Sequence, residues 1–244
     1  MKSKKVLFIT TSHDQMGNTG KMTGAWLEEL ATPYYILKDA GAEVTLASPN
    51  GGSVPLDPKS QSIMVATSNT KRFLKDEEAM RFLSHSVILE EINADDFDMV
   101  FLPGGHGPLW DIDGNKTVKQ LLETFNNDGK LIAAVCHGVV GLLAIQDDTG
   151  QLVIKGKQLT GFSNTEEDSA GLTSIVPVLL ETELVTRGAL YTKGANHTPH
   201  VVADGNIITG QNAVSSEAVA KKMLGFSRIN KPVEKPGRVI DQIV

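Results

Sequence analysis

The single cysteine of this 244-residue chain is the residue best suited to covalent chemistry. Cys136 follows a short apolar run, residues 131–135, and precedes Gly138, after which a second apolar run favours a helix. At such a strand-turn-helix corner, free amides and the helix dipole stabilise a thiolate, so we expect a lowered thiol pKa. Strained turns of this kind carry the nucleophile of Gly-x-Ser-x-Gly enzymes. The alternative is a structural cysteine, because free cysteine is among the most buried residue types.

A carboxylate in an unusual position precedes the cysteine in the chain. Residues 23–41 begin with a capping threonine, have apolar residues at helical spacing and end in glycine, which predicts a helix interrupted at Pro33. Pro33 lacks the amide that would bond the carbonyl of Glu29, so we expect a kink on the turn that carries Glu29. The alternative is an ordinary glutamate on a helix surface.

Two further segments offer polar groups. Residues 98–107 read as a buried strand that ends in a Gly-Gly-His-Gly turn. This turn lacks the lysine of a P-loop and the spacing of Gly-x-Gly-x-x-Gly, so we favour a role in binding an oxyanion over one in binding phosphate. His197 and His200 could line a pocket or bind a metal, but no glutamate at helical spacing completes a ligand set, and we predict no metal site.

The elements around these residues alternate between strand and helix, which predicts one α/β domain over residues 1–226. An insertion is expected around residues 50–95, and the tail, residues 227–244, shows no period. The pattern predicts strands at residues 5–11, 43–49, 98–102, 131–135 and 158–162, two short strands within 201–209, and helices at 23–41, 76–84, 115–127, 177–186 and 215–224.

Composition excludes several classes of function. With 41% hydrophobic residues the chain can bury a large core, and a net charge of -6 without a basic cluster argues against nucleic-acid binding. The apolar stretch at residues 6–9 is too short for a signal peptide or a membrane span. One cysteine excludes an intramolecular disulfide and a zinc ribbon and fits a reducing compartment, so we expect a cytoplasmic protein.

Four short motifs together resemble the PfpI-like superfamily, which includes the class I glutamine amidotransferases. They read Phe-Leu-Pro-Gly-Gly-His-Gly, Ala-Ala-Val-Cys-His-Gly, Thr-Gly-x-x-x-x-Glu and Thr-Gly-Phe-Ser-Asn-x-Glu-Glu, and the likeness covers roughly residues 4–224. Within the superfamily the chain is most similar to the branch of heat-shock chaperones and glutathione-independent glyoxalase III. The resemblance implies a flavodoxin-like three-layer sandwich with a mostly parallel central sheet, and a homodimer.

The resemblance also implies roles for four side chains. Cys136 matches the nucleophile, and Glu29 matches a carboxylate that approaches the thiol and should have a raised pKa. His137 matches the histidine that follows the nucleophile, and Glu167 matches the acid that orients it. Without the resemblance, Glu167 could equally be an acid that stabilises a helix N-terminus, and His137 a histidine satisfied by a nearby carbonyl.

The remaining candidates concern the substrate. The amides of Gly105 and His137 match the oxyanion hole of the superfamily, and His106 matches a residue close to the thiol. We add His200 as a substrate-binding candidate, although His106 could simply shape the glycine-rich corner.

The function that the resemblance implies is a lyase that needs no cofactor. A small α-ketoaldehyde, methylglyoxal or glyoxal, would become lactate or glycolate through a cysteine hemithioacetal, with His137 as the base. The alternatives are a holdase chaperone, a protein deglycase or a thiol stress sensor, and, with less support, a cysteine peptidase or amidase. A glutamine amidotransferase is disfavoured, because it needs a downstream His-x-Glu arrangement where this chain has His-Thr-Pro-His.

Overall fold

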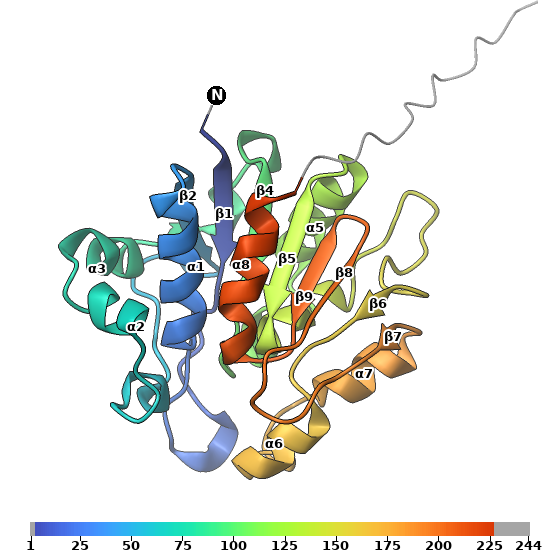
Figure 1. The fold of residues 1–244 in the computed structure, drawn as a ribbon. Helices are drawn as coiled ribbons and strands as arrows, with labels where there is room; N and C mark the ends of the chain where they lie inside the picture. The colour runs from blue at the N-terminus through green and yellow to red at the C-terminus, as the bar shows by residue number, and fades with distance from the viewer. Residues whose placement is uncertain (1–2, 227–244) are drawn as a thin grey trace, which may run out of the picture.

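The computed structural model describes residues 3–226, which form a seven-stranded sheet with the strand order β3-β2-β1-β4-β5-β9-β8 (Figure 1). Neighbouring strands are parallel except for the β8–β9 hairpin. This confirms the mostly parallel sheet and the two short strands expected within residues 201–209. The strands are β1 (Lys5–Ile9), β2 (Glu43–Ser48), β3 (Val87–Ile88), β4 (Met99–Leu102), β5 (Leu131–Val135), β8 (Val201–Asp204) and β9 (Ile207–Gly210).

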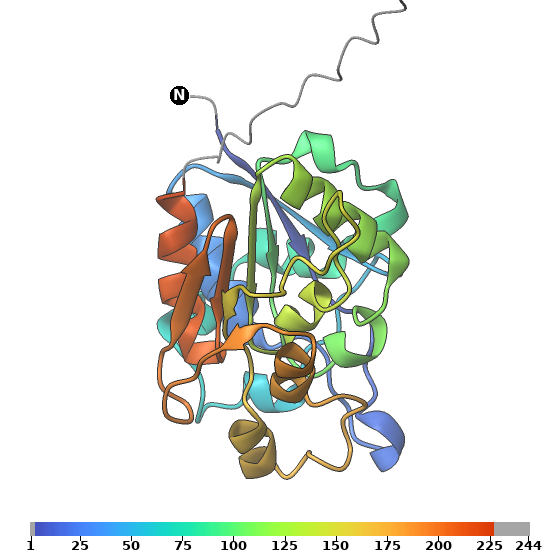
Figure 2. The same ribbon diagram turned by 90° about the vertical axis from the view of Figure 1, so that its right-hand side faces the viewer.

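Helices cover both faces of the sheet, which explains why its central strands are apolar along their whole length. Every residue of β5 is buried, and alternate residues enter two separate cores. Ile132 faces the core beneath one helix, and Ala133 faces the core beneath two others. Figure 2 shows these layers from the side: α1 (Leu27–Asp39) and α8 (Ser216–Leu224) lie on one face and α5 (Lys116–Asn127) on the other.

Polar caps set several helix starts where the sequence predicts them. The side chain of Asn115 accepts hydrogen bonds from the amides at the start of α5, and Asp76 does the same for α3 (Glu77–Ser84). The described chain also contains α2 (Ser68–Phe73), α4 (Pro108–Asp111), α6 (Asn164–Ala170), α7 (Leu180–Thr186) and a separate two-stranded parallel sheet of β6 (Gln158–Leu159) and β7 (Leu190–Tyr191).

The start predicted for the first helix is wrong. The hydroxyl of Thr23 donates a hydrogen bond to Asp57 and does not cap a helix, because residues 23–26 are held extended by bonds between Ala25 and the loop at residues 55–57. Helix α1 begins only at Leu27 and then continues through Pro33 without the expected interruption. Glu29 therefore lies in the first turn of this helix.

Residues 50–95, where we expect an insertion, contain short helices, and β3 from this segment extends the main sheet beside β2. The predicted tail, residues 227–244, lies outside the described residues. Within residues 3–226, no helix has both the length and the apolar composition needed to cross a membrane.

Candidate active site

The predicted catalytic side chains meet at the carboxyl ends of the central strands, where open parallel sheets place their ligands. Cys136 directly follows β5, and the turn that contains Gly105 follows β4. Glu29 comes from α1 and Glu167 from α6. A cavity of about 270 Å³ opens at this point, and its walls include Cys136, His137, Glu29, Gly105 and His106.

The backbone of Cys136 is strained, as the nucleophile-turn pattern predicts. Its φ is +57°, in the left-handed region that residues with a Cβ atom rarely adopt. Cys136 is the first residue of a seven-residue 3-10 helix, Cys136–Leu142. A Cβ atom at Gly138 would lie 2.3 Å from the carbonyl oxygen of Leu102, so a glycine is needed for this turn to pack against the end of β4.

Glu29 is buried beside the thiol. Glu29 is only 1% exposed, and its Oε2 accepts a hydrogen bond of 2.7 Å from the amide of Gly104. Oε1 has no partner of good hydrogen-bonding geometry among the described residues, while Cys136 lies close enough to affect the pKa of the carboxyl. Burial raises the pKa of Glu29 to about 8, against the smaller effects of Cys136 and Gly104. The expectation of a raised pKa is confirmed.

The expectation of a lowered pKa for Cys136 is wrong. Burial raises the pKa of the thiol, and the adjacent Glu29 raises it further. The amides of His137 and Gly105 approach the sulfur and favour the thiolate, but they do not offset burial. The resting cysteine is therefore a thiol, which must lose its proton as it attacks.

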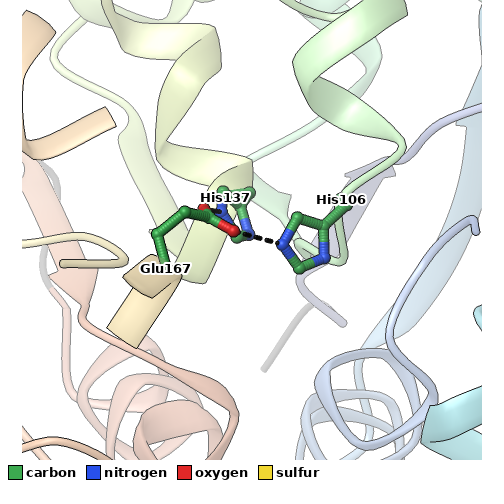
Figure 3. Close-up of side chains that lie close together, drawn as sticks. All are labelled: His106, His137 and Glu167. Carbon is green, nitrogen blue, oxygen red and sulfur yellow. Dashed lines mark hydrogen bonds and ion pairs between the residues drawn. The ribbon is translucent and has the colours of Figure 1, made fainter. Parts of the chain in front are cut away.

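Glu167 joins two imidazoles (Figure 3). His137 Nε2 lies 2.6 Å from Glu167 Oε2, and His106 Nε2 lies 2.8 Å from Oε1. Burial favours the neutral acid, but the hydrogen bonds of His106 and His137 hold the pKa of Glu167 well below its ordinary value. Glu167 is thus an ionised carboxylate that accepts a hydrogen bond from each ring.

This arrangement determines which nitrogen of His137 is free to act. Burial lowers the pKa of His137, and the neighbouring His106 lowers it further, so the ring is neutral. When Nε2 donates its proton to Glu167, Nδ1 keeps a lone pair, and this atom lies 3.5 Å from Cys136 Sγ. Nucleophile, base and orienting acid therefore form one chain of contacts.

The same three side chains could also hold a metal ion. Ligand atoms of His106, His137 and Glu167 lie within 4.8 Å of one another, and two histidines with a carboxylate are a set that zinc uses. Each oxygen of Glu167 is, however, paired with one imidazole nitrogen, and we interpret the group as a proton-handling network on that basis.

The substrate-binding candidates divide into two groups. Gly105 and His106 line the cavity, and a Cβ atom at Gly105 would lie 2.2 Å from the carbonyl oxygen of Gly24. The placement expected for His200 is wrong: it is not part of the cavity wall, and its Nε2 lies 3.0 Å from Thr192 Oγ1. His197, three residues earlier, is part of the cavity wall instead, and it lies in a turn closed by the hydrogen bond from the amide of Thr198 to the carbonyl of Ala195.

One important residue is missing from the predicted set. Glu166 is fully buried, and its carboxylate accepts hydrogen bonds from the backbone amide and the hydroxyl of Ser163. It also accepts hydrogen bonds from the backbone amide of His197 and from the side-chain amides of Gln211 and Asn212. The pattern Ser163-Asn-Thr-Glu166 is a capping box, and both of its hydrogen bonds are present. This pattern is visible in the sequence and could have identified Glu166.

Comparison with known proteins decides the family. A family model described as the DJ-1/PfpI family matches residues 22–225. The chain belongs to the DJ-1/PfpI family. A glutathione-independent glyoxalase of Saccharomyces cerevisiae is 30% identical, with 92% of this chain and 98% of that protein covered. Family membership confirms the resemblance found in the sequence, and with the observed sheet it confirms the flavodoxin-like fold.

Two solved structures are similar to this member of the DJ-1/PfpI family over nearly their whole length. The Rapid Encystment Protein of Francisella tularensis has a TM-score of 0.86 and 38% identity, covering 90% of this chain and 97% of that one. Glyoxalase III of Candida albicans has a TM-score of 0.85 and 28% identity, covering 91% and 96%. The branch that contains glyoxalase III is therefore the one that this chain resembles.

Proposed function

We propose that this protein is a glutathione-independent glyoxalase of the glyoxalase III type, which converts methylglyoxal to lactate and glyoxal to glycolate. The observation that carries the proposal is the Cys136–His137–Glu167 chain at the wall of a small cavity. Similarity to proteins named glutathione-independent glyoxalase and glyoxalase III supports it.

The first step forms a carbon–sulfur bond. As Cys136 Sγ attacks the aldehyde carbon, the thiol proton passes to His137 Nδ1, which lies 3.5 Å from the sulfur. The aldehyde oxygen becomes an oxyanion, which the amides of Gly105 and His137 are placed to stabilise because both approach the sulfur. Transfer of that proton from His137 to the oxyanion gives a hemithioacetal and returns the imidazole to its neutral form.

The second step moves a proton between adjacent carbons. Neutral His137 removes the proton from the carbon bonded to sulfur, and the resulting enediolate is reprotonated on the neighbouring carbon, which gives a hydroxy-thioester. Water then hydrolyses the thioester, releasing the hydroxy acid and the free thiol. Reactant and product have the same oxidation level once the added water is counted, so these reaction steps need no external oxidant or reductant.

Glu29 supplies a second proton donor in this scheme. With a pKa of about 8, its carboxyl is mainly protonated at neutral pH. A neutral acid beside Cys136 can donate a hydrogen bond to the thiolate or to the developing oxyanion without adding a second buried anion. This role explains why a carboxyl group can be buried next to a nucleophilic sulfur.

Apolar side chains in the cavity wall shelter the reacting groups from water. Trp26 and Phe162 form part of the wall, and the ring of Phe162 lies 4.4 Å from that of His137, centroid to centroid. An apolar wall of this kind limits the access of water, which strengthens the hydrogen bonds around the reacting atoms.

A holdase chaperone is the second candidate, and one observation favours it. Ile63 and Met64 are 86% and 91% exposed, and the neighbouring Val65 lines the catalytic cavity. Exposed apolar side chains of this kind can bind unfolded polypeptides.

The Cys136→Ala variant separates the two functions. We expect it to lose the consumption of methylglyoxal, measured without glutathione, while its thermal unfolding midpoint stays near that of the wild type. Suppression of the aggregation of a heat-unfolded protein should survive this change if the holdase function exists. Unchanged consumption of methylglyoxal by the variant would contradict the enzyme proposal.

A further inference from the structure

Only two residues other than glycine have a positive φ within residues 3–226: Cys136 at +57° and His197 at +58°. Both line the same cavity. Residues with a Cβ atom are held in this region of φ only where the surrounding structure enforces it, and such residues gather at functional sites. The strain at Cys136 belongs to the nucleophile turn, and the strain at His197 has no part in the mechanism described above.

His197 lies in a tight turn. The amide of Thr198 donates a hydrogen bond of 3.2 Å to the carbonyl of Ala195, which makes His197 the third residue of the turn. Turns with a positive φ at the third position favour glycine or asparagine there. The backbone conformation therefore does not explain a histidine, because glycine would adopt it without strain.

A buried carboxylate fixes this turn to the catalytic part of the molecule. Glu166 Oε1 accepts the amide of His197 at 2.9 Å and the side-chain amide of Asn212 at 2.8 Å. Glu166 lies in α6, directly before Glu167, which holds His137. The position of His197 is thus coupled to the helix that orients the catalytic base.

The imidazole of His197 is free to bind a ligand. Its residue is exposed at the cavity wall, and among the described residues the ring has no hydrogen-bond, ion-pair or aromatic partner. The other histidines nearby differ in this respect: His106 and His137 both bind Glu167, and His200 binds Thr192.

We propose that His197 is a substrate-binding residue whose ring N–H donates a hydrogen bond to the second oxygen of an α-ketoaldehyde. The inference rests on the proposed glyoxalase function. An α-ketoaldehyde carries two adjacent oxygens, and the amides beside Cys136 account only for the oxygen on the attacked carbon. The ketone oxygen needs its own donor, and His197, a residue of the cavity wall whose ring has no partner among the described residues, can supply one.

The test compares His197→Gly with the wild type in steady-state turnover of methylglyoxal. Glycine keeps the positive φ and removes only the ring, so we expect kcat/KM to fall about ten- to hundredfold and kcat to fall with it, because the ketone oxygen carries the developing negative charge of the enediolate and its hydrogen bond is strongest in the transition state. The unfolding midpoint should stay the same or rise, because strain is relieved. His85→Ala, which changes an exposed histidine outside the cavity wall, is the matched control.

An unchanged kcat/KM in His197→Gly would overturn the inference and leave the turn with a purely structural role. If the glycine variant unfolds early, His197→Asn decides, since asparagine tolerates the same backbone conformation and removes the imidazole. Absence of lactate formation by the wild type is a separate outcome: it overturns the proposed function and this inference with it.

Discussion

The thiol of Cys136 and the carboxyl of Glu29 compete for one negative charge in a buried site. Burial raises the pKa of both groups, so the pair holds two protons at rest and releases one only when a substrate, or His137, accepts it. The sequence predicted the raised pKa of Glu29 but not that of Cys136. The amides near the sulfur follow from the local strand-turn-helix pattern, whereas the depth of burial depends on chain segments that a local pattern does not contain.

Replacing the base His137 should separate proton transfer from nucleophilic attack by Cys136. In His137→Ala, we expect turnover of methylglyoxal to fall about 10²–10⁴-fold, the usual contribution of a general base. Cys136 should still react with iodoacetamide, measured by intact-protein mass spectrometry. Near-wild-type kcat in this variant would place the base elsewhere, and His106 would be the next residue to replace.

The pKa of Glu29 predicts how stability depends on pH. The folded protein keeps the Glu29 proton up to about pH 8, whereas the unfolded chain loses it near 4.5, so the folded state binds more protons between these values and stability falls as pH rises. Relative to Glu29→Gln, the wild type should lose about 3–4 kcal/mol of unfolding free energy between pH 5 and pH 8, slightly less than the full 1.36 kcal/mol per pH unit because the carboxyl is partly ionised near pH 8.

Denaturant titrations of both proteins at these two pH values measure this difference. The change in His137 protonation is common to both proteins and cancels in the comparison. Equal pH dependence in the wild type and Glu29→Gln would show that Glu29 is ionised in the folded protein throughout this range.

At the scale of elements, α6 connects the catalytic group to the cavity wall. Its capping box fixes Glu166, which binds the turn of His197, while the next residue, Glu167, holds two imidazoles. The strands and most helices could be predicted because apolar period and caps are local signals. The contacts of Glu166 with His197, Gln211 and Asn212 could not, since these partners lie 31 to 46 residues away in the sequence.

Removing the cap of α6 should affect stability and activity together. Ser163 is buried, and its hydroxyl accepts the amide of Glu166 and lies 2.8 Å from its carboxylate. Ser163→Ala should cost about 0.5–2 kcal/mol, the usual cost of losing a capping side chain. It should also lower kcat, because Glu167 is carried on the loosened first turn.

Denaturant unfolding and steady-state kinetics at one temperature test this prediction. Thr117→Ala, in the first turn of α5 outside the cavity wall, is a suitable control for a change near a helix start. A loss of stability in Ser163→Ala without any change in kcat would mean that α6 does not need its cap to position Glu167.

At the level of the whole molecule, exposed apolar side chains bear on the oligomeric state. We predict a homodimer, as the resemblance to the superfamily implies, and the exposed apolar side chains of Val185 and Leu190 offer contact area on neighbouring elements. Multi-angle light scattering at micromolar concentration should give about twice the chain mass of 26.2 kDa. A particle of one chain mass would contradict the prediction. The interface itself depends on the shapes of two surfaces, which a pattern in one sequence does not specify.

In the proposed mechanism, the protein alone converts an α-ketoaldehyde to a hydroxy acid through Cys136. The most direct measurement is ¹H NMR of methylglyoxal incubated with the purified protein, without glutathione or any added cofactor. We predict one lactate for each methylglyoxal consumed, many turnovers per chain, and no lactate above background with Cys136→Ala. Consumption of methylglyoxal without lactate, or equal lactate formation by Cys136→Ala, would contradict the account.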